Sequence, residues 1–277
     1  MVVKSISKKF RVFITILLLL ILLFPIYWVV ISSLQPNDFL FKLPPHFTLK
    51  FGTINNYQRV LANNQYVKYF FNSMLISTCT VILSIFASIL AAYALSRIKI
   101  KGKNAILVFI LSIQMFPIVG ILITLYTFFC KWHLLNTYFG VILADTTFSL
   151  PLSIVLLKSF IDTVPYSLDE AAKIDGCSKT GILFRIILPT IKPGILAVGI
   201  FAFMKSWDDF LFSLIIMMDN AKKTLPVGLA QSFLGEYVHD YGGMMALSVC
   251  ATVPVLLLFI FFQKYMISGM TSGAVKG

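Results

Sequence analysis

Long apolar stretches dominate the pattern of hydrophobic and polar positions in this chain, and they are continuous instead of alternating. A helix needs roughly 20 apolar residues to cross about 30 Å of hydrocarbon. The pattern contains such stretches at about 12–31, 70–95, 105–129, 138–161, 190–217 and 244–266. Continuous runs favour helices over a β-barrel. The sequence therefore predicts an all-α polytopic membrane protein with six transmembrane helices, forming a single domain over 1–277.

The composition agrees with a membrane protein and changes how the first stretch is interpreted. The chain is 277 residues long, 58% hydrophobic and 12% charged, with a mean hydropathy of +0.90. A soluble domain of this length could not bury so much apolar surface. The first apolar run is longer than the core of a signal peptide and no small-residue cleavage pattern follows it, so we interpret it as a retained helix.

The formal net charge of +12 predicts orientation. Lys and Arg gather before the first helix, between the second and third, between the fourth and fifth, and after the sixth. The positive-inside rule then places both termini and the segment 163–189 in the cytoplasm of a multi-pass cell-membrane protein. Nucleic-acid binding would need a contiguous basic face with aromatic residues, and no such face is present.

The segment 163–189 carries helix signals where a short turn would suffice. Ser167 and Glu170 have the spacing of a capping box, and Gly176 is placed to end that helix in a left-handed conformation. Ser178 can cap a second helix, which Pro189 stops or bends. We predict a polar helical hairpin that another protein holds; the alternative is an amphipathic helix lying on lipid headgroups.

The fifth apolar stretch contains the charged residues Lys205, Asp208 and Asp209. On a continuous helix they would share one face, and charge at membrane depth points to function by default. With Trp207 and Phe210, this face could line the path of a hydroxyl-rich solute. The alternative is a self-neutralising structural cluster facing a companion helix bundle. We expect Asp145, the other acid in an apolar stretch, to lie near the outer end and to be solvated.

Motifs for catalysis are missing from the sequence. There is no GxxxxGK[ST] loop to cradle phosphate, no HExxH, no GxSxG and no metal-ligand spacing. We therefore predict a protein that is not an enzyme and has no cofactor or metal of its own. The four Cys residues lack paired spacing and are predicted to pack, not to form disulfides.

Several segments of the chain resemble a known family. The stretch Glu170–Gly176, followed by Leu188, Pro189 and Pro193, is similar to the EAA loop of binding-protein-dependent ABC importer permeases. The maltose-type carbohydrate branch is resembled by further segments, which are 207–210 (WDDF), 225–229 (LPVGL), Pro254, 263–265 (QKY) and the tail 269–277. Three positions depart from the family pattern: Cys177 for Ala, Leu183 for Phe, and Asp208 for Asn.

The resemblance implies a type I importer permease fold and a set of partners. The protein partners are a second, homologous permease in a heterodimer, a cytoplasmic ATPase dimer that binds the ATP, and an extracellular solute-binding protein. The substrate is a sugar, which we expect to be an oligosaccharide, and the chain also contacts membrane lipid. The residues it implies for coupling to the ATPase are Glu170, Ala171, Ala172, Asp175 and Gly176. It also implies that the cytoplasmic tail, 267–277, contacts the ATPase through Gly273, Ala274, Val275, Lys276 and Gly277.

Two other classes of protein remain as alternatives. An ion-coupled secondary transporter or channel using Lys205, Asp208 and Asp209 would work without an ATPase. A membrane-embedded enzyme is disfavoured by the missing catalytic motifs. The outer segment 32–69 is either a docking surface or a solvated connector, and the sequence does not choose between them.

Overall fold

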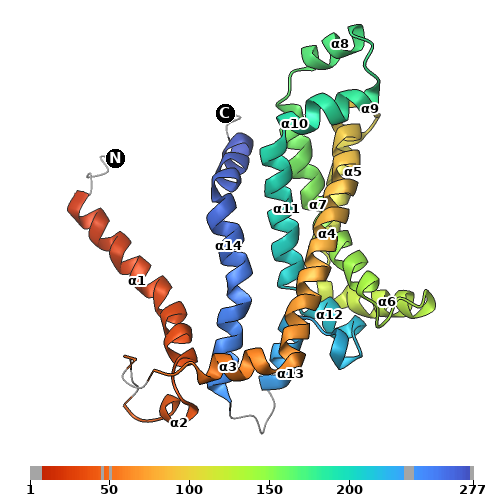
Figure 1. The fold of residues 1–277 in the computed structure, drawn as a ribbon. Helices are drawn as coiled ribbons and strands as arrows, with labels where there is room; N and C mark the ends of the chain where they lie inside the picture. The colour runs from red at the N-terminus through yellow and green to blue at the C-terminus, as the bar shows by residue number, and fades with distance from the viewer. Residues whose placement is uncertain (1–7, 45–46, 50–51, 234–239, 275–277) are drawn as a thin grey trace. The chain divides into compact units, whose positions relative to one another are not determined.

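The computed structural model describes residues 8–44, 47–49, 52–233 and 240–274, and within these ranges the chain is helical without strands (Figure 1). The predicted all-α fold is confirmed. The α-helices are α1 Lys8–Ser33, α2 Asn37–Leu40, α3 Asn55–Ala62, α4 Asn64–Arg97, α5 Lys103–Ser112, α6 Ile118–Lys131, α7 Tyr138–Asp162, α8 Tyr166–Ile174, α9 Lys179–Ile182, α10 Leu188–Thr190, α11 Lys192–Trp207, α12 Leu211–Ile216, α13 Leu225–Phe233 and α14 Tyr241–Ala274. Short 3₁₀ segments cover Ile113–Met115 and Asn220–Lys222, and a π-helical segment covers Leu183–Ile187.

Four of these helices are long and apolar enough to cross a membrane by themselves: α1, α4, α7 and α14. Two further pairs pass the same test together but are bent. Lys103–Met115 and Ile118–Lys131 meet at 96°, and Lys179–Thr190 and Lys192–Trp207 meet at 80°. If each bent pair is one span, the described residues hold six spans. Pro117, at the first bend, lacks the N–H that a continuous helix would need.

The chain divides into two compact units, 1–67 with 229–253 and 68–228 with 254–277. In the first unit, a polar cluster joins the short helices to the start of α14. Asp240 accepts hydrogen bonds from Asn37 Nδ2 at 2.8 Å and from the Gly243 amide at 3.0 Å, and it pairs with Arg59 at 3.1 Å. Burial alone would raise the pKa of Asp240, but these hydrogen bonds and the Arg59 charge hold it below its usual value.

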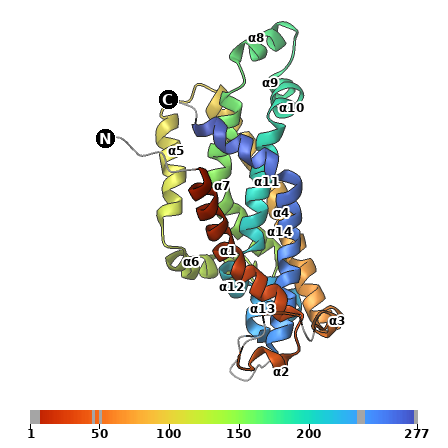
Figure 2. The same cartoon turned by 90° about the vertical axis from the view of Figure 1, so that its left-hand side faces the viewer.

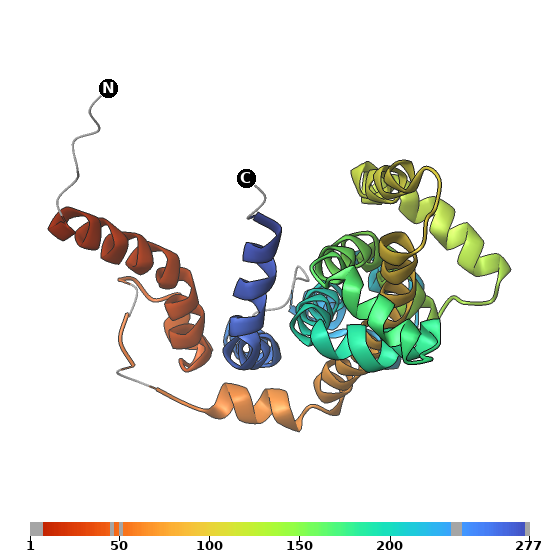
Figure 3. The ribbon, with the colours of Figure 1, turned by 90° about the horizontal axis from the view of Figure 1, so that it is seen from above.

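The second unit is built around α4, α7 and α11, which lie side by side when seen from above (Figure 3). Two apolar clusters fill it. One contains Ile76 of α4, Val141 of α7 and Ile216 of α12. The other contains Ala92 of α4, Leu157 of α7 and residues of the segment 163–191. The hairpin predicted from the sequence thus packs against the bundle through buried apolar residues that it shares with α4 and α7.

Candidate functional site

The segment after α7 forms a helix–turn–helix whose first helix is α8 (Figure 2). Gly176 has φ +79°, as the sequence predicted for a left-handed end. The Cys177 amide donates to the Ala172 carbonyl at 2.8 Å and the Gly176 amide donates to the Lys173 carbonyl at 3.1 Å. This pair of bonds is the Schellman motif, which satisfies the last carbonyls of a helix. A tight, fixed turn therefore follows the Glu170–Asp175 stretch.

The two predicted helix starts have different outcomes. Ser178 caps α9, because its hydroxyl accepts the Gly181 amide at 3.1 Å. The capping box at Ser167 is wrong: the N-cap of α8 is Pro165, two residues earlier, and no side chain caps the helix. Pro165 fixes its own φ and leads directly into the helix. Ser167 is then already helical and cannot take the extended conformation of an N-cap.

One face of α8 is buried and the other is open. Ala172 is 6% exposed and belongs to the core cluster with Ile161 and Ile182. Glu170, Ala171 and Asp175 are exposed. Ile174 is 87% exposed, which is unusual for a large apolar side chain in the last turn of a polar helix. Among the predicted coupling residues, Ala172 thus anchors α8 in the core, whereas Glu170, Ala171 and Asp175 are accessible to a partner.

A buried ion pair ties α8 to the end of α4. Arg97 Nε lies 3.0 Å from Asp169 Oδ2, and the two side chains are only 4% and 7% exposed. Arg97 Nη2 also donates to the Val164 carbonyl at 2.6 Å, and its guanidinium lies over the Tyr166 ring at 4.2 Å. This pair was not predicted from the sequence, in which Arg97 contributes only to the positive charge expected on the cytoplasmic side. No local signal joins it to Asp169, although the acid directly precedes Glu170.

The expected helix over 190–217 is interrupted beside its charged residues. Helix α11 ends at Trp207 and α12 begins at Leu211. The Asp209 carboxylate accepts the amides of Phe212 at 3.1 Å and Ser213 at 2.8 Å, so it caps α12 from the break. The predicted single helical face through Lys205, Asp208 and Asp209 is therefore wrong. An acid that can accept free amides favours ending one helix and starting another.

The other residues predicted for the solute path have different environments at this break. Trp207 is buried, stacked on Phe203 at 5.5 Å and edge-on to Phe70 at 5.6 Å between ring centroids. Phe210 is partly buried, whereas Lys205 and Asp208 are exposed. The prediction for Asp145 is wrong. This side chain is buried and accepts a hydrogen bond from Ser206 at 2.5 Å, because α7 turns it toward α11 and away from solvent.

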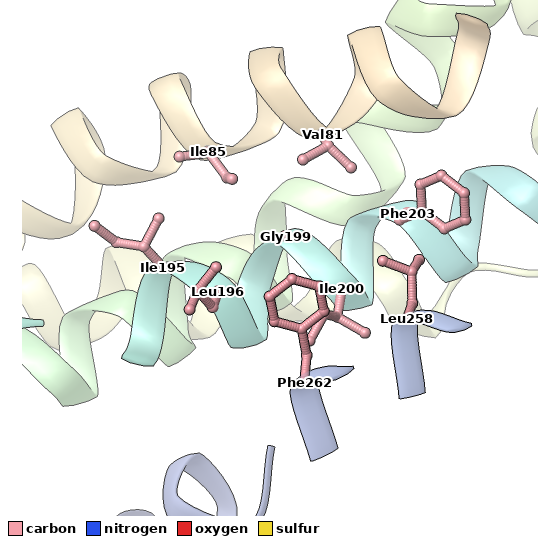
Figure 4. Close-up of a pocket in the computed structure, with 9 residues that line it drawn as sticks. All are labelled: Val81, Ile85, Ile195, Leu196, Gly199, Ile200, Phe203, Leu258 and Phe262. Atoms are coloured by element: carbon pink, nitrogen blue, oxygen red, sulfur yellow. The ribbon is translucent and has the colours of Figure 1, made fainter. Parts of the chain in front are cut away.

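An apolar cavity of about 210 Å³ lies along α11. Figure 4 shows Val81 and Ile85 of α4 above it and Leu258 and Phe262 of α14 on another side. Its lining presents no groups that could bind sugar hydroxyls. Among the described residues, no group of three or more His, Cys, Asp or Glu is placed to hold a metal ion.

The predicted tail contact falls at the limit of the described chain. Gly273 and Ala274 belong to the end of α14. Val275, Lys276 and Gly277 lie outside the described residues.

Several helices that are long and apolar enough to cross a membrane, with a polar hairpin between two of them, define a multi-pass α-helical membrane protein. A family model described as "binding-protein-dependent transport system inner membrane component" matches residues 84–272. The chain belongs to this family, and the family predicted from the sequence is confirmed. Membership makes it the membrane component of a transport system that depends on a binding protein.

Curated relatives match nearly the whole chain. The sulfoquinovosyl glycerol transport system permease protein SmoH of Agrobacterium fabrum is 35% identical over 98% of this chain and 95% of its own length. The trehalose/maltose transport system permease protein MalG of Thermococcus litoralis is 37% identical over 95% and 94%. The arabinooligosaccharides transport system permease protein AraQ of Bacillus subtilis is 35% identical over 94% and 93%.

Solved structures show the same fold. A bacterial ABC transporter involved in the import of the acidic polysaccharide alginate aligns with a TM-score of 0.79 at 20% identity, over 94% of this chain and 98% of that one. The alginate transporter in complex with its pentasaccharide-bound periplasmic protein aligns with a TM-score of 0.68 at 15% identity, over 94% of each chain. The predicted importer permease fold is confirmed.

Proposed function

We propose that this chain is one of two permease subunits in an ABC importer for a sugar, and that it forms half of the translocation path. The proposed substrate class is supported by the relatives, whose names specify sulfoquinovosyl glycerol, trehalose or maltose, and arabinooligosaccharides. These ligands share many hydroxyl groups on sugar rings. An oligosaccharide is the substrate we expect.

The observation that carries the mechanism is the division of α8 into a held face and an open face. Ala172 is buried in the bundle core, while Glu170 and Ala171 on the same helix are exposed. A helix held in this way can be gripped by another protein and can pass the resulting movement to the bundle. The exposed Ile174 adds an apolar contact at its end. We assign the grip to a cytoplasmic ATPase dimer, which binds and hydrolyses the ATP.

The remaining parts of the proposal follow from charge and family. The positive-inside pattern supports cytoplasmic termini and a cytoplasmic α8. The partners are a second, homologous permease, a solute-binding protein on the outer face and the ATPase. Residues Gly273–Gly277 would supply a second ATPase contact. The protein itself would act without a cofactor of its own.

For the solute path we keep Trp207, Asp208, Asp209 and Phe210, with roles refined by their surroundings. Asp208 is the exposed carboxylate at the break, where it can accept hydrogen bonds from sugar hydroxyls. Asp209 holds α12, and Trp207 packs the end of α11 against Phe70. Asp209 and Trp207 therefore position Asp208, and Phe210 provides an aromatic ring beside it.

The coupling proposal is tested by purifying the tagged chain from its own membranes in mild detergent and measuring how much ATPase is recovered with it. The Glu170→Lys variant is expected to lose most of the ATPase, because its charge reversal falls on the open face of α8. The matched control is Lys101→Glu, an exposed charge reversal in the neighbouring inner turn. Equal ATPase recovery by wild type and Glu170→Lys would overturn the docking site.

A second measurement separates the importer from an ion-coupled transporter. Vesicles holding the purified complex are expected to take up labelled maltose, trehalose or arabinooligosaccharide only with ATP and the solute-binding protein present. Uptake by vesicles that contain this chain alone, without any response to ATP, would favour the secondary transporter. Uptake of none of the three sugars by an ATP-hydrolysing complex would argue against the proposed substrate class.

A further inference from the structure

We propose that the buried Arg97–Asp169 ion pair is the joint through which movement of α8 reaches α4. This inference rests on the proposed coupling function and adds positioning residues that lie outside the Glu170–Gly176 stretch. Neither residue is accessible to a partner, since both side chains are almost fully buried. Their role would be to keep α8 and α4 moving together.

Burial distinguishes this pair from the other ion pairs in the described part of the chain. Arg59 and Asp240 have side chains 54% and 36% exposed, and Lys158 and Asp162 have side chains 17% and 35% exposed. Exposed pairs contribute little to stability. A buried pair is costly to desolvate, and removing one partner leaves the other charge uncompensated. Separation of α8 from α4 at this point is therefore strongly opposed.

The end of α4 is the part of the bundle to which α8 is attached. Ser96 and Arg97 are the last two residues of α4. Ser96 donates to Asp162 Oδ1 at 2.5 Å, at the end of α7, and its carbonyl accepts the Tyr166 hydroxyl at 2.7 Å. Arg97 reaches Asp169 inside α8. The end of α4 thus contacts the end of α7 and the first half of α8.

Other attachments of α8 are few. Of its nine residues, only Asp169 and Ala172 are buried. Ala172 contributes one methyl group to the core, and apolar contact is non-directional. The ion pair is directional and charged, and together with the Tyr166 hydrogen bond to the Ser96 carbonyl it limits the rotation of α8 about its own axis.

The pair also has unused bonding capacity. Arg97 Nη1 and Asp169 Oδ1 are buried without a hydrogen-bond partner, and the close Nε and Oδ2 atoms are not aligned for a hydrogen bond. Arg and carboxylate can form two parallel hydrogen bonds. A small rotation of α8 could therefore convert the present contact to a forked one without separating the charges. Such a pair can stay closed while α8 and α4 move together.

The test measures whether α8 and α4 keep a fixed distance when ATP binds. Spin labels are placed at the exposed positions Leu168 of α8 and Leu90 of α4, with the four native cysteines replaced. Distances are recorded by pulsed electron resonance on the purified complex, without nucleotide and with ATP and vanadate. The unmodified pair is expected to give one narrow distance in both states. Asp169→Asn is expected to lose the single distance while the complex still retains its ATPase.

The matched control is Lys158→Gln, which removes a more exposed ion pair at the end of α7 and should keep the single distance. An unchanged narrow distance in Asp169→Asn would overturn the joint. If Asp169→Asn does not assemble, the double variant R97D/D169R decides. Return of assembly and of the single distance supports the ion pair as the link, and failure of either overturns it.

Failure of this inference is distinguishable from failure of the proposed function. A wild-type chain that recovers no ATPase, or that binds ATPase regardless of Glu170→Lys, removes the coupling function itself. Glu170-dependent recovery combined with a single distance in Asp169→Asn leaves coupling intact and removes only the joint.

Discussion

Two of the interruptions in the helical bundle of the second unit, the hairpin 163–191 and the break at 208–210, handle charge in opposite ways. In the hairpin, Asp169 is buried against a distant arginine, Arg97. At the break, Asp209 is satisfied by the amides of Phe212 and Ser213, which follow it closely in the chain. The hairpin thus depends on tertiary contact, whereas the break is stabilised locally.

This difference suits two different tasks. A segment that transmits movement must be fixed to a helix of the bundle, and a buried ion pair resists separation. A segment beside a solute path needs only to end one helix and present an exposed group, which a local cap achieves.

Ala172→Asp is expected to have the largest effect. The new carboxylate would lie in the core beside Ile161 and Ile182 without a partner, and burying an unpaired charge costs on the order of several kcal/mol. We expect a large loss of folded protein, measured by thermal denaturation in detergent with size-exclusion detection.

The matched variant is Ala171→Asp, one residue away on the exposed face. It should keep the thermal stability of the wild type while lowering ATPase recovery. Equal stability losses in the two variants would show that α8 does not have one held face and one open face.

Gly176→Val is expected to weaken the turn through the backbone alone. Gly176 has φ +79° and a Cβ there would meet no atom within 4 Å, so no steric clash contributes. The left-handed conformation costs a residue with a side chain roughly 1–2 kcal/mol. Sugar uptake should fall with a modest loss of thermal stability. Gly176→Asn is the control, since Asn tolerates this conformation better, and a Val variant as active as the Asn variant would argue against a required left-handed turn.

How much the sequence predicted depends on the range of the interactions involved. The Gly176 turn and the Ser178 cap depend on residues within a few positions, and both were predicted correctly. The hydrophobic runs likewise predicted the helical fold. The Arg97–Asp169 pair could not be predicted, because it joins residues brought together only by packing of α4 against the hairpin.

The break after Trp207 shows a different limit. Apolar residues continue on both sides of it, so periodicity favoured one helix over 190–217. The helix is interrupted here because the Asp209 carboxylate accepts the backbone amides of Phe212 and Ser213. Acids beside an apolar run carry this signal, but the same residues were also compatible with a charged helical face. Asp145 was misplaced for a related reason, since its burial depends on Ser206 of α11.

Asp209→Ala is expected to destabilise the start of α12 by about 1 kcal/mol, the usual cost of losing a helix cap. Thermal denaturation in detergent measures the loss. ATPase recovery should be unchanged, because the break is separate from α8 along the bundle (Figure 1). Asp209→Asn keeps an acceptor oxygen and should lose less. A drop in ATPase recovery would contradict the separation of the two interruptions.

Asp208→Ala is expected to have the smallest effect on stability and a clear effect on transport. The Asp208 side chain is exposed, and surface substitutions away from special contacts usually change stability by less than about 0.5 kcal/mol. If Asp208 accepts hydrogen bonds from sugar hydroxyls, its removal lowers uptake in vesicles holding the whole complex. Lys205→Ala serves as the control for a general loss of charge at this end of α11. Wild-type uptake by Asp208→Ala would remove this carboxylate from the path, and reduced ATPase recovery would show that the break and the hairpin are coupled more closely than their different anchoring implies.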